Sequence, residues 1–439
     1  MIAPVHPVRT NPLRALNHRA YRVLWLGALV SNIGTWMETL AVGVHVTETT
    51  GKAGWTGTVA ALAFVPAVVI GPVAGALADR FERRRYLVLV TLLQAVLAGL
   101  LAVLALTNHL SLLAVSVLMV LTGCASAVLN PAFFALLINL VGEDDLTSAM
   151  TLNSAQFNLA RITGPALAAA ILVTWGLPVT LGLNAISFLA VLISVLVVLR
   201  QPQHPTGKRE ALWEGIRTGL DVARRDAGIR GVLVLTFTTA LLISPFIGLV
   251  PVMAIKIFGR GAHETSMLVT CQGVGAVCSA VLSTAFADAF GRRRLVEGAA
   301  WAIAPVAALY WMSPTYGFAL PAMALLGATY LSVATGANTV GLSRAPRHAQ
   351  ARISSLFSVV LGGGYGFGLV ALGWLGDQFG VRQVAVGACA LYLVLLLAQR
   401  ALLPRFFQAM DEPLPGSELP LPEGSALPPE LVAGREAAG

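Results

Sequence analysis

The stretch Gly75-Ala-Leu-Ala-Asp79-Arg-Phe-Glu-Arg-Arg-Arg85 recurs 209 residues later, in altered form, as Thr284-Ala-Phe-Ala-Asp288-Ala-Phe-Gly-Arg-Arg-Arg294. Each copy joins two long apolar runs, with an acidic residue at the end of the first run and three consecutive arginines before the second. This arrangement predicts a tight turn between two membrane-spanning helices, in the cytoplasmic headgroup layer. Because the pattern occurs twice, we expect the chain to consist of two copies of one structural unit.

The composition independently predicts a protein with many membrane-spanning segments. Hydrophobic residues make up 56% of the 439 residues and only 11% are charged, so the polar groups are too few to cover a soluble surface. A helix needs about 20 apolar residues to cross a bilayer. We therefore expect an all-α integral membrane fold, with twelve transmembrane helices in two pseudo-symmetric six-helix bundles. The expected helices are residues 22–46, 56–78, 86–107, 111–138, 148–174, 179–199, 231–255, 267–287, 295–312, 317–340, 353–376 and 382–402.

The chain divides into four segments on the same grounds. The linker has apolar residues at helical spacing from Leu212 to Ala223, which predicts an amphipathic helix in the inner interface. The C-terminal tail is rich in proline and acidic residues, so we expect it to be disordered. The segments are an N-terminal bundle at 1–200, a cytoplasmic linker at 201–230, a C-terminal bundle at 231–404 and a cytoplasmic tail at 405–439.

The distribution of Lys and Arg predicts the orientation. If both termini are cytoplasmic, 24 of these residues lie on the cytoplasmic side and four lie outside. Such a split follows the positive-inside rule, and it places the protein in the cell membrane, cytoplasmic or inner, as a multi-pass protein. The net charge of +8 therefore reflects topology and attraction to anionic lipid in the bilayer, and we expect no nucleic-acid binding. The four outer cations are Lys52, Lys256, Arg260 and Arg382.

The repeated motif resembles the signature of the major facilitator superfamily. In that family the loop between helices 2 and 3 reads G-x-L-A-D-R-x-G-R-[RK], and a weaker copy lies between helices 8 and 9. The first copy here has Glu82 where the family usually has Gly, and the second keeps Gly291 but has Thr284 and Ala289 in place of the leading Gly and the Arg. The resemblance implies a secondary transporter that works by alternating access, with its site between two halves.

Residues 143–165 resemble the start of helix 5 in the enterobactin-exporter-like and drug-exporter branch of that superfamily. Gly164 and Pro165 resemble its antiporter motif, G-x-x-x-G-P-x-x-G-G, although alanines replace three of the glycines. A proline among small residues permits a bend and close helix contact, so we expect Gly164 and Pro165 to act in gating. The resemblance implies proton-coupled efflux of an amphipathic small molecule, drug-like or siderophore-like.

Charged residues inside apolar runs are costly and mark functional sites. Glu38 lies about 24 Å along its helix from Arg22, and Ser31, Glu38 and His45 share one helix face. Burial favours the neutral form of Glu38, whereas Arg161 or a cationic substrate favours the charged form. We therefore expect Glu38, Arg161 and His45 to carry proton coupling. For Arg161 two roles stay open: pairing with the substrate or with Glu38 deep in the cavity, and pinning the cytoplasmic gate. For His45 a hydrated interfacial position stays open. Exporters of the branch more often have Gln at the position of Glu38.

The two motif loops predict a gate. An Asp at a helix end and an Arg in the next turn can form charge-assisted bonds to the opposite half when the cytoplasmic side is closed. The alternative is that these residues serve only as topology signals. The gating residues expected from the loops are Gly75, Asp79, Arg80, Arg83, Asp288 and Arg292.

Polar and aromatic residues inside the apolar runs are candidates for the substrate cavity, with ordinary interhelical packing as the alternative. We expect a small-molecule substrate and protons as partners, a monomer, and no cofactor or metal. The candidate cavity residues are Asn32, Trp36, Asn158, Gln272, Tyr330, Asn338 and Tyr365.

Three rival functions remain. One is a receptor or signalling protein built on a transporter scaffold, although no large soluble domain supports it. A second is a proton-linked importer of a metabolite. The third is an intramembrane lipid-linked transferase, in which Glu143, Asp144 and Asp145 hold a divalent cation and a diphosphate. An acidic cluster directly before a helix more simply caps its N-terminus and complements its dipole, so we expect no enzyme.

Overall fold

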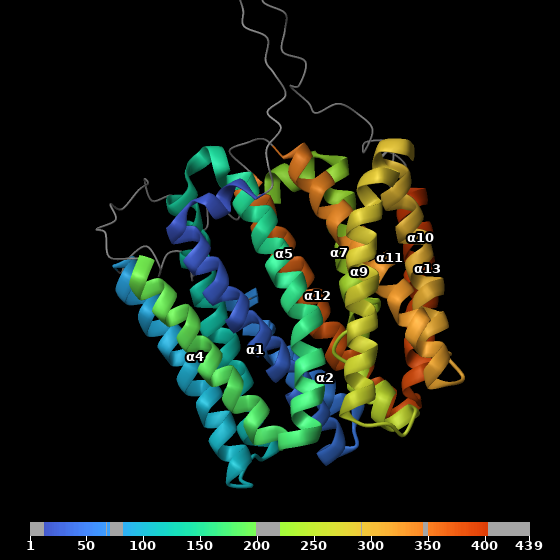
Figure 1. Cartoon of the computed structure of the whole chain (residues 1–439). Coiled ribbons are helices and arrows are strands. Elements are labelled where there is room, and N and C mark those ends of the chain that lie inside the picture. The colour runs from blue at the N-terminus through green and yellow to red at the C-terminus, as the bar shows by residue number, and fades with distance from the viewer. Residues whose placement is uncertain are drawn as a thin grey trace, which may run out of the picture.

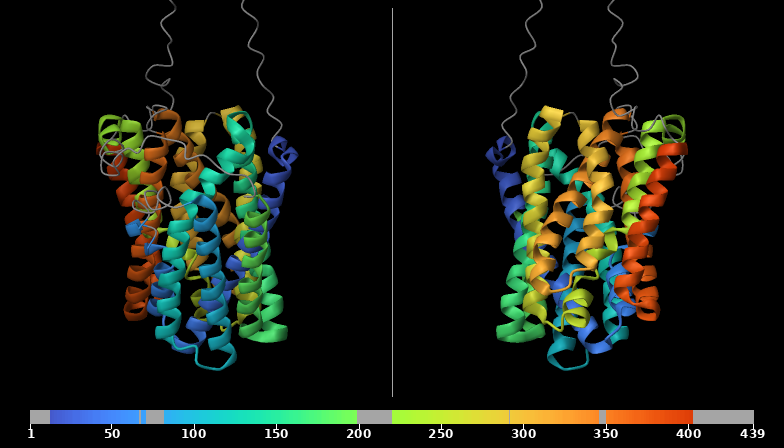
Figure 2. Two further views of the ribbon diagram at one scale, coloured as in Figure 1. Left: turned by 90° about the vertical axis from the view of Figure 1, so that its left-hand side faces the viewer. Right: turned by 90° about the vertical axis from the view of Figure 1, so that its right-hand side faces the viewer.

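The computed structural model confirms a predominantly helical protein. It describes residues 13–66, 68–70, 82–198, 220–290, 292–345 and 350–402, and within these ranges the chain is almost entirely helical. Figure 1 shows long helices side by side, with α1, α4 and α5 toward one side and α9, α10, α11 and α13 toward the other. In the two side views the long axes of these helices lie roughly parallel to one another (Figure 2). We call residues 13–198 the N-terminal half and residues 220–402 the C-terminal half.

The helices of the N-terminal half agree broadly with the apolar runs. A short 3-10 turn, η1, precedes α1, and the region predicted as a helix at 56–78 begins with α2. The elements are η1 at Arg14–Asn17, α1 at Arg19–Thr50, α2 at Ala53–Leu62, α4 at Arg83–Leu106 and α5 at Leu112–Val198.

Two glycines divide α5, which is 87 residues long. Gly142 has φ 71° and Gly176 has φ 81°, values that glycine adopts far more easily than other residues because it lacks a Cβ. These breaks separate three helical stretches, and they fall between the helices predicted at 111–138, 148–174 and 179–199.

The C-terminal half contains one departure from the predicted helices. The expected helix at 231–255 ends as a regular α-helix at Leu242, because Pro245 and Pro251 provide no N–H for helical hydrogen bonds. A 3-10 turn, a short α-turn and a π-helical turn complete the segment. The elements are α7 at Ala227–Leu242, η2 at Ser244–Phe246, α8 at Val250–Val252, η3 at Met253–Ile257, α9 at Ala262–Phe290, α10 at Arg292–Trp311, α11 at Tyr316–Arg344, α12 at Gln350–Phe379 and α13 at Val381–Leu402.

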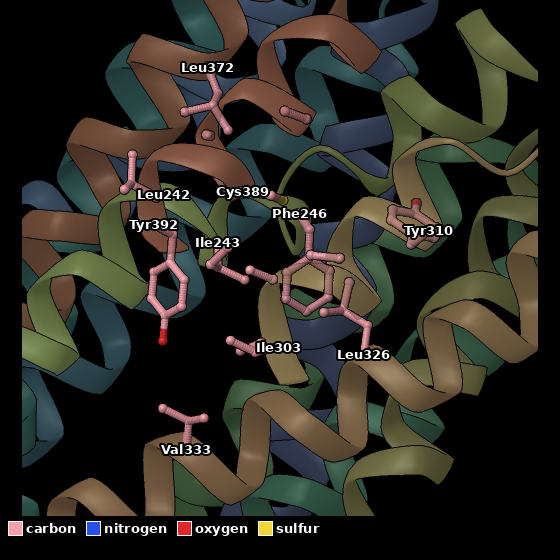
Figure 3. Close-up of a cluster of buried hydrophobic side chains, with 14 of the residues drawn as sticks. Leu242, Ile243, Phe246, Ile303, Tyr310, Leu326, Val333, Leu372, Cys389 and Tyr392 are labelled. Atoms are coloured by element: carbon pink, nitrogen blue, oxygen red, sulfur yellow. The ribbon is translucent and has the colours of Figure 1, made fainter. Parts of the chain in front are cut away.

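The buried apolar side chains follow the division into halves. The largest cluster belongs mostly to the C-terminal half, and Phe246, Leu326 and Tyr310 lie in it (Figure 3). Two further clusters lie within the N-terminal half, around Leu136 and around Leu101. Each half is therefore packed largely around its own core, which allows it to move as a unit.

The lengths and surfaces of the helices suit a bilayer. Among the described residues, seven helical stretches are long and apolar enough to cross a membrane, and one of them, Ser148–Val198, contains the break at Gly176. Large apolar side chains such as Leu113, Phe367 and Leu402 are more than 70% exposed. Such a surface is unfavourable in water and favourable against lipid tails.

Asp226 secures one end of the C-terminal half. Its carboxylate caps α7 by accepting from the Ile229 N–H at 2.8 Å, and it receives Arg344 at the end of α11 through bonds of 2.9 and 3.2 Å. Burial alone would raise the pKa of the Asp226 carboxyl, but these hydrogen bonds outweigh burial and hold the pKa below its usual value.

The predicted linker is described only from Leu220 onward, and the tail at 405–439 lies outside the described residues.

Candidate substrate and coupling site

Arg161 is a buried cation that has no acidic partner among the residues that the structure describes. It lies in the second stretch of α5 and is 9% exposed, and its Cζ atom is 5.7 Å from the centroid of the Trp36 ring on α1. Its Nη2 atom is buried without a hydrogen-bond partner, and no ion pair or hydrogen bond joins the guanidinium to any described residue. A buried guanidinium is normally paired with a carboxylate or fully hydrogen-bonded.

Aromatic side chains from both halves lie near Arg161. The hydroxyl groups of Tyr330 on α11 and Tyr365 on α12 are within electrostatic range of its guanidinium. Three edge-to-face pairs extend this set: Trp36 with Phe157 at 5.6 Å between centroids, Phe64 with Tyr365 at 5.3 Å and Phe246 with Tyr330 at 5.7 Å. We call these six residues the aromatic cluster: Trp36, Phe64, Phe157, Phe246, Tyr330 and Tyr365.

Gly164 brings α1 and α5 together beside Arg161. A Cβ at Gly164 would lie 2.6 Å from the Trp36 Cβ and 2.8 Å from the Ile33 carbonyl oxygen, so a larger residue would force the helices apart. The next residue, Pro165, accepts a hydrogen bond of 2.7 Å from the Ser266 hydroxyl on α9. The predicted gating pair therefore lies where α1, α5 and α9 meet.

Glu38 occupies a separate site inside the N-terminal half. It is 5% exposed, and its carboxylate accepts a bond of 2.6 Å from the Asn184 amide in the third stretch of α5. The predicted pairing with Arg161 is absent. The reason is helical geometry: Glu38 and Trp36 are two residues apart on α1 and so point about 200° apart, and Arg161 lies on the face of Trp36.

The other predicted cavity and coupling residues fall into three groups. Gln272 on α9 is buried, and both atoms of its side-chain amide lack a hydrogen-bond partner. Asn32 and His45 are half-buried. Asn158 donates to a carbonyl one turn earlier in its own helix, and Asn338 is exposed, so neither joins the aromatic cluster through a described contact.

The predicted gating loops lie largely outside the described residues. Gly75, Asp79 and Arg80 fall in the range that the structure does not describe. Arg83, Asp288 and Arg292 lie in helices α4, α9 and α10, but their side chains are not described.

Asp377 joins the two halves in a way that the sequence did not reveal. This α12 residue accepts hydrogen bonds of 2.8 Å from the backbone N–H groups of Ala53 and Gly54, at the start of α2. It also forms an ion pair of 3.2 Å with Lys256 in η3. The N-cap residue of α2, Lys52, makes no capping hydrogen bond with its own side chain. We call Asp377, these two N–H groups and Lys256 the Asp377 latch.

Trp374 extends this contact along α2 and α12. Its indole N–H donates to the Thr58 hydroxyl at 3.1 Å, and its ring lies edge-on to Trp55 at 5.5 Å. A Cβ at Gly54 would approach the Trp374 ring to 2.7 Å, so the helices touch closely here. The only sequence signal for Asp377 was a carboxylate just beyond a predicted helix, which does not identify a partner more than 300 residues away.

Asp145, from the predicted acidic cluster, already has protein partners. It pairs with Arg14 at 2.9 Å and with His18 at 2.8 Å, and the neighbouring Ser148 hydroxyl accepts from the Ala15 N–H at 3.0 Å. These bonds fasten the start of α1 to α5. Among the described residues, no group of three His, Cys, Asp or Glu side chains is placed to hold a metal ion.

Comparison with known proteins decides the family. The sequence profile of the transmembrane secretion effectors, a branch of the major facilitator superfamily, matches residues 10–423. The chain belongs to this family. The members of this family are multi-pass membrane transporters and not enzymes, so the transferase alternative is excluded.

The curated relatives of this family member include efflux proteins. Macrolide efflux protein A of Streptococcus pyogenes is 25% identical over 55% of this chain, and the match spans 61% of that relative, less than two thirds of its length. The multidrug efflux pump Tap of Mycolicibacterium fortuitum is 24% identical over 87% of this chain and 95% of its own. The enterobactin exporter EntS of Citrobacter koseri is 25% identical over 93% and 96%.

Solved structures share the fold of this transporter. A bacterial homologue of the human lysosomal transporter Spinster superposes with a TM-score of 0.71 at 13% identity, covering 89% of this chain and 98% of that one. The D-xylose–proton symporter superposes with a TM-score of 0.66 at 14% identity, over 90% and 99%. At these identities the likeness shows the fold alone.

The Asp377 latch predicts that Asp377→Asn loosens the junction of α2 and α12. Charge-assisted hydrogen bonds contribute about 1.5–3 kcal/mol, so their loss increases opening about tenfold or more. The measurement uses a protein without its four native cysteines, with Thr58 replaced by cysteine. More frequent opening makes this cysteine react faster with a hydrophilic maleimide in the Asp377→Asn variant than in its parent.

The matched control for this experiment is Glu264→Gln. Glu264 accepts a backbone bond from Gly261 in its own half, so its removal leaves the junction intact. Equal reaction rates for the Asp377→Asn protein and its parent would show that the latch does not hold the halves together.

Proposed function

We propose that this protein is a secondary active transporter that exports an amphipathic small molecule in exchange for protons, by alternating access. In this proposal twelve helices form two six-helix bundles, both termini are cytoplasmic, and the protein works as a monomer in the cell membrane. The observation that carries the proposal is Arg161 with its aromatic cluster, because side chains of both halves contribute to one site.

The composition of this site suits an amphipathic ligand. Aromatic faces offer apolar contact to a ring or chain, while a few polar groups fix the orientation of the ligand. Arg161 and the hydroxyl groups of Tyr330 and Tyr365 supply the polar contacts. A substrate held between Trp36 on α1 and Tyr365 on α12 touches both halves and therefore responds when they move.

Alternating access requires contacts between the halves that form and break at opposite ends. The Asp377 latch supplies such a contact at one end, between α2 and α12. We assign the opposite end to the motif loops, with Asp79 and Arg83 as the first gate and Asp288 and Arg292 as its weaker copy. Gly75, Arg80 and the contact at Gly164 and Pro165 belong to the same gating movement.

Glu38 is our candidate for the proton carrier. Its carboxylate has one described partner, the neutral amide of Asn184, and no cation. A carboxylate buried at this depth without a cation is costly in its ionised form, so Glu38 must gain water or another partner to release a proton. A movement of α1 against α5 provides that change, because the two residues lie on these helices.

Export is the favoured direction. The relatives named as efflux proteins, Tap and EntS, align over most of their length, and the macrolide efflux protein aligns over part of it. A proton-linked importer shares the same fold, so direction needs its own test.

Export predicts that expression of the protein lowers the steady-state cell content of at least one labelled amphipathic compound. The measurement compares a host without its own efflux pumps, carrying the protein or an empty vector, across a panel of compounds. Dissipating the proton gradient must abolish the difference. A protein-dependent rise in cell content would show an importer instead.

Proton coupling through Glu38 predicts a specific loss in Glu38→Gln. In proteoliposomes with an imposed pH gradient, this variant does not concentrate a labelled compound that the wild type concentrates, but it still exchanges labelled for unlabelled compound without a gradient.

Glu48→Gln is the matched control, since Glu48 lies on the same helix and is exposed. It should transport like the wild type. If Glu38→Gln concentrates the compound at the wild-type rate, another group carries the proton, and His45 is the next residue to replace.

A further inference from the structure

We propose that the ligand of the Arg161 site is an organic anion, whose acidic group binds Arg161 and whose aromatic ring lies in the aromatic cluster. The inference rests on the proposed function, because it names the class of molecule that the transporter carries. It follows from the charge balance at Arg161, from the buried Nη2 atom of its guanidinium that has no hydrogen-bond partner, and from a second unpaired polar side chain, Gln272 on α9.

The charge of Arg161 is not balanced by the described part of the protein. Among the described residues, the groups within electrostatic range of its guanidinium are two tyrosine hydroxyls, and no carboxylate is among them. Glu38, the carboxylate that the sequence offered as its partner, lies on another face of α1 and is bound to Asn184 of α5. A buried charge without a counter-charge is strongly unfavourable, and binding an anion removes this cost.

Another arginine of the same chain shows what a structural role requires. The side chain of Arg344 is 8% exposed, which is close to the burial of Arg161. Arg344 is held by both carboxylate oxygens of Asp226, at 2.9 and 3.2 Å. This buried structural arginine is therefore paired with a carboxylate, whereas Arg161 is paired with none in the described part of the chain.

Trp36 contacts the face of the Arg161 guanidinium and not its hydrogen-bonding edge. The ring covers the guanidinium at 5.7 Å, as in a cation–π contact. A guanidinium donates hydrogen bonds in its own plane, and a planar carboxylate accepts two of them side by side. The unpaired Nη2 atom of Arg161 is one such donor.

Gln272 provides a second polar group from the opposite half. Its side-chain amide is buried, and both the oxygen and the nitrogen lack partners. The next residue on α9, Gly273, contacts Ile162, the residue after Arg161. The amide therefore lies on the helix that meets α5 at the level of Arg161, and it suits a further polar group of the ligand.

A cationic ligand does not fit this arrangement. It would bring a second positive charge to an unneutralised guanidinium in a buried setting, with no carboxylate of the aromatic cluster to offset the repulsion. A neutral ligand would leave the charge of Arg161 unbalanced.

The test uses matched aromatic probes that differ only in charge. The probes are 2-naphthoate, its neutral amide and 2-naphthylmethylamine, with the corresponding benzene and quinoline compounds. Binding to the purified full-length protein in nanodiscs is measured at equilibrium with labelled 2-naphthoate and by competition with the other compounds. We expect the anions to bind at least about tenfold more tightly than the amides, and the amines most weakly.

Arg161→Gln should remove the preference for the anion, and Arg161→Lys should keep part of it, because a lysine retains the charge but not the planar fork. Arg161→Gln should also raise the melting temperature of the ligand-free protein by about 2 °C or more, since it removes an unpaired buried charge. Arg260→Gln is the matched control: Arg260 is exposed and lies over the Tyr316 ring, away from the cluster.

Three results would overturn the inference. They are binding of the amide as tightly as the anion, an unchanged anion preference in Arg161→Gln, and failure of every anion to bind up to its solubility limit. None of these bears on export itself, because cell content and gradient-driven transport are measured without reference to ligand charge. Conversely, anion-selective binding without gradient-driven transport would refute the proposed function and leave the site intact.

Discussion

The two halves are held together at one end by a helix cap: a residue of the C-terminal half caps the start of a helix of the N-terminal half. The first N–H groups of any α-helix have no partner within the helix. In α2 the side chain of the N-cap residue Lys52 does not accept them, and Asp377 of α12 accepts two of them, with Lys256 beside it. These bonds favour a closed junction because they give hydrogen-bond partners to two N–H groups at the start of α2 and to the Asp377 carboxylate. They are also reversible, because this junction is at a helix end, where water can replace them.

Helix α1 connects the substrate site with the proposed proton site. Its Trp36 faces Arg161 and the junction of the halves, whereas Glu38, two residues later, faces Asn184 inside the N-terminal half. The two buried charges are therefore separated by the body of one helix and do not neutralise each other. A rotation or shift of α1 changes both environments at once, since Gly164 holds Trp36 against α5. This arrangement explains how ligand binding and proton transfer can be coupled without direct contact between the groups.

The sequence predicted the class of fold and the charges inside apolar runs. It did not predict contacts between residues that are far apart in the chain. Apolar runs located most helices, because the length needed to cross a bilayer leaves a local signal. The end of α7 at Leu242 was missed because hydrophobicity continued past it while the hydrogen bonding changed at Pro245. Glu38 and Arg161 stood out as charges in apolar runs, but helix rotation, which separates them, is not visible in composition. Asn184 and Asp377 carried no local signal for their roles.

The central claim is that the halves open at one end as they close at the other. The most direct measurement is the distance between paired spin labels on the wild-type background, recorded in nanodiscs at acidic and alkaline pH. One pair, at Thr49 and Met312, reports on the end with the Asp377 latch, and a second, at Asn17 and Leu402, reports on the opposite end; all four positions are exposed. We expect two distance populations for each pair, with the latch-end distance lengthening as the other shortens. A single unchanged population for both pairs, or distances that lengthen together, would contradict it.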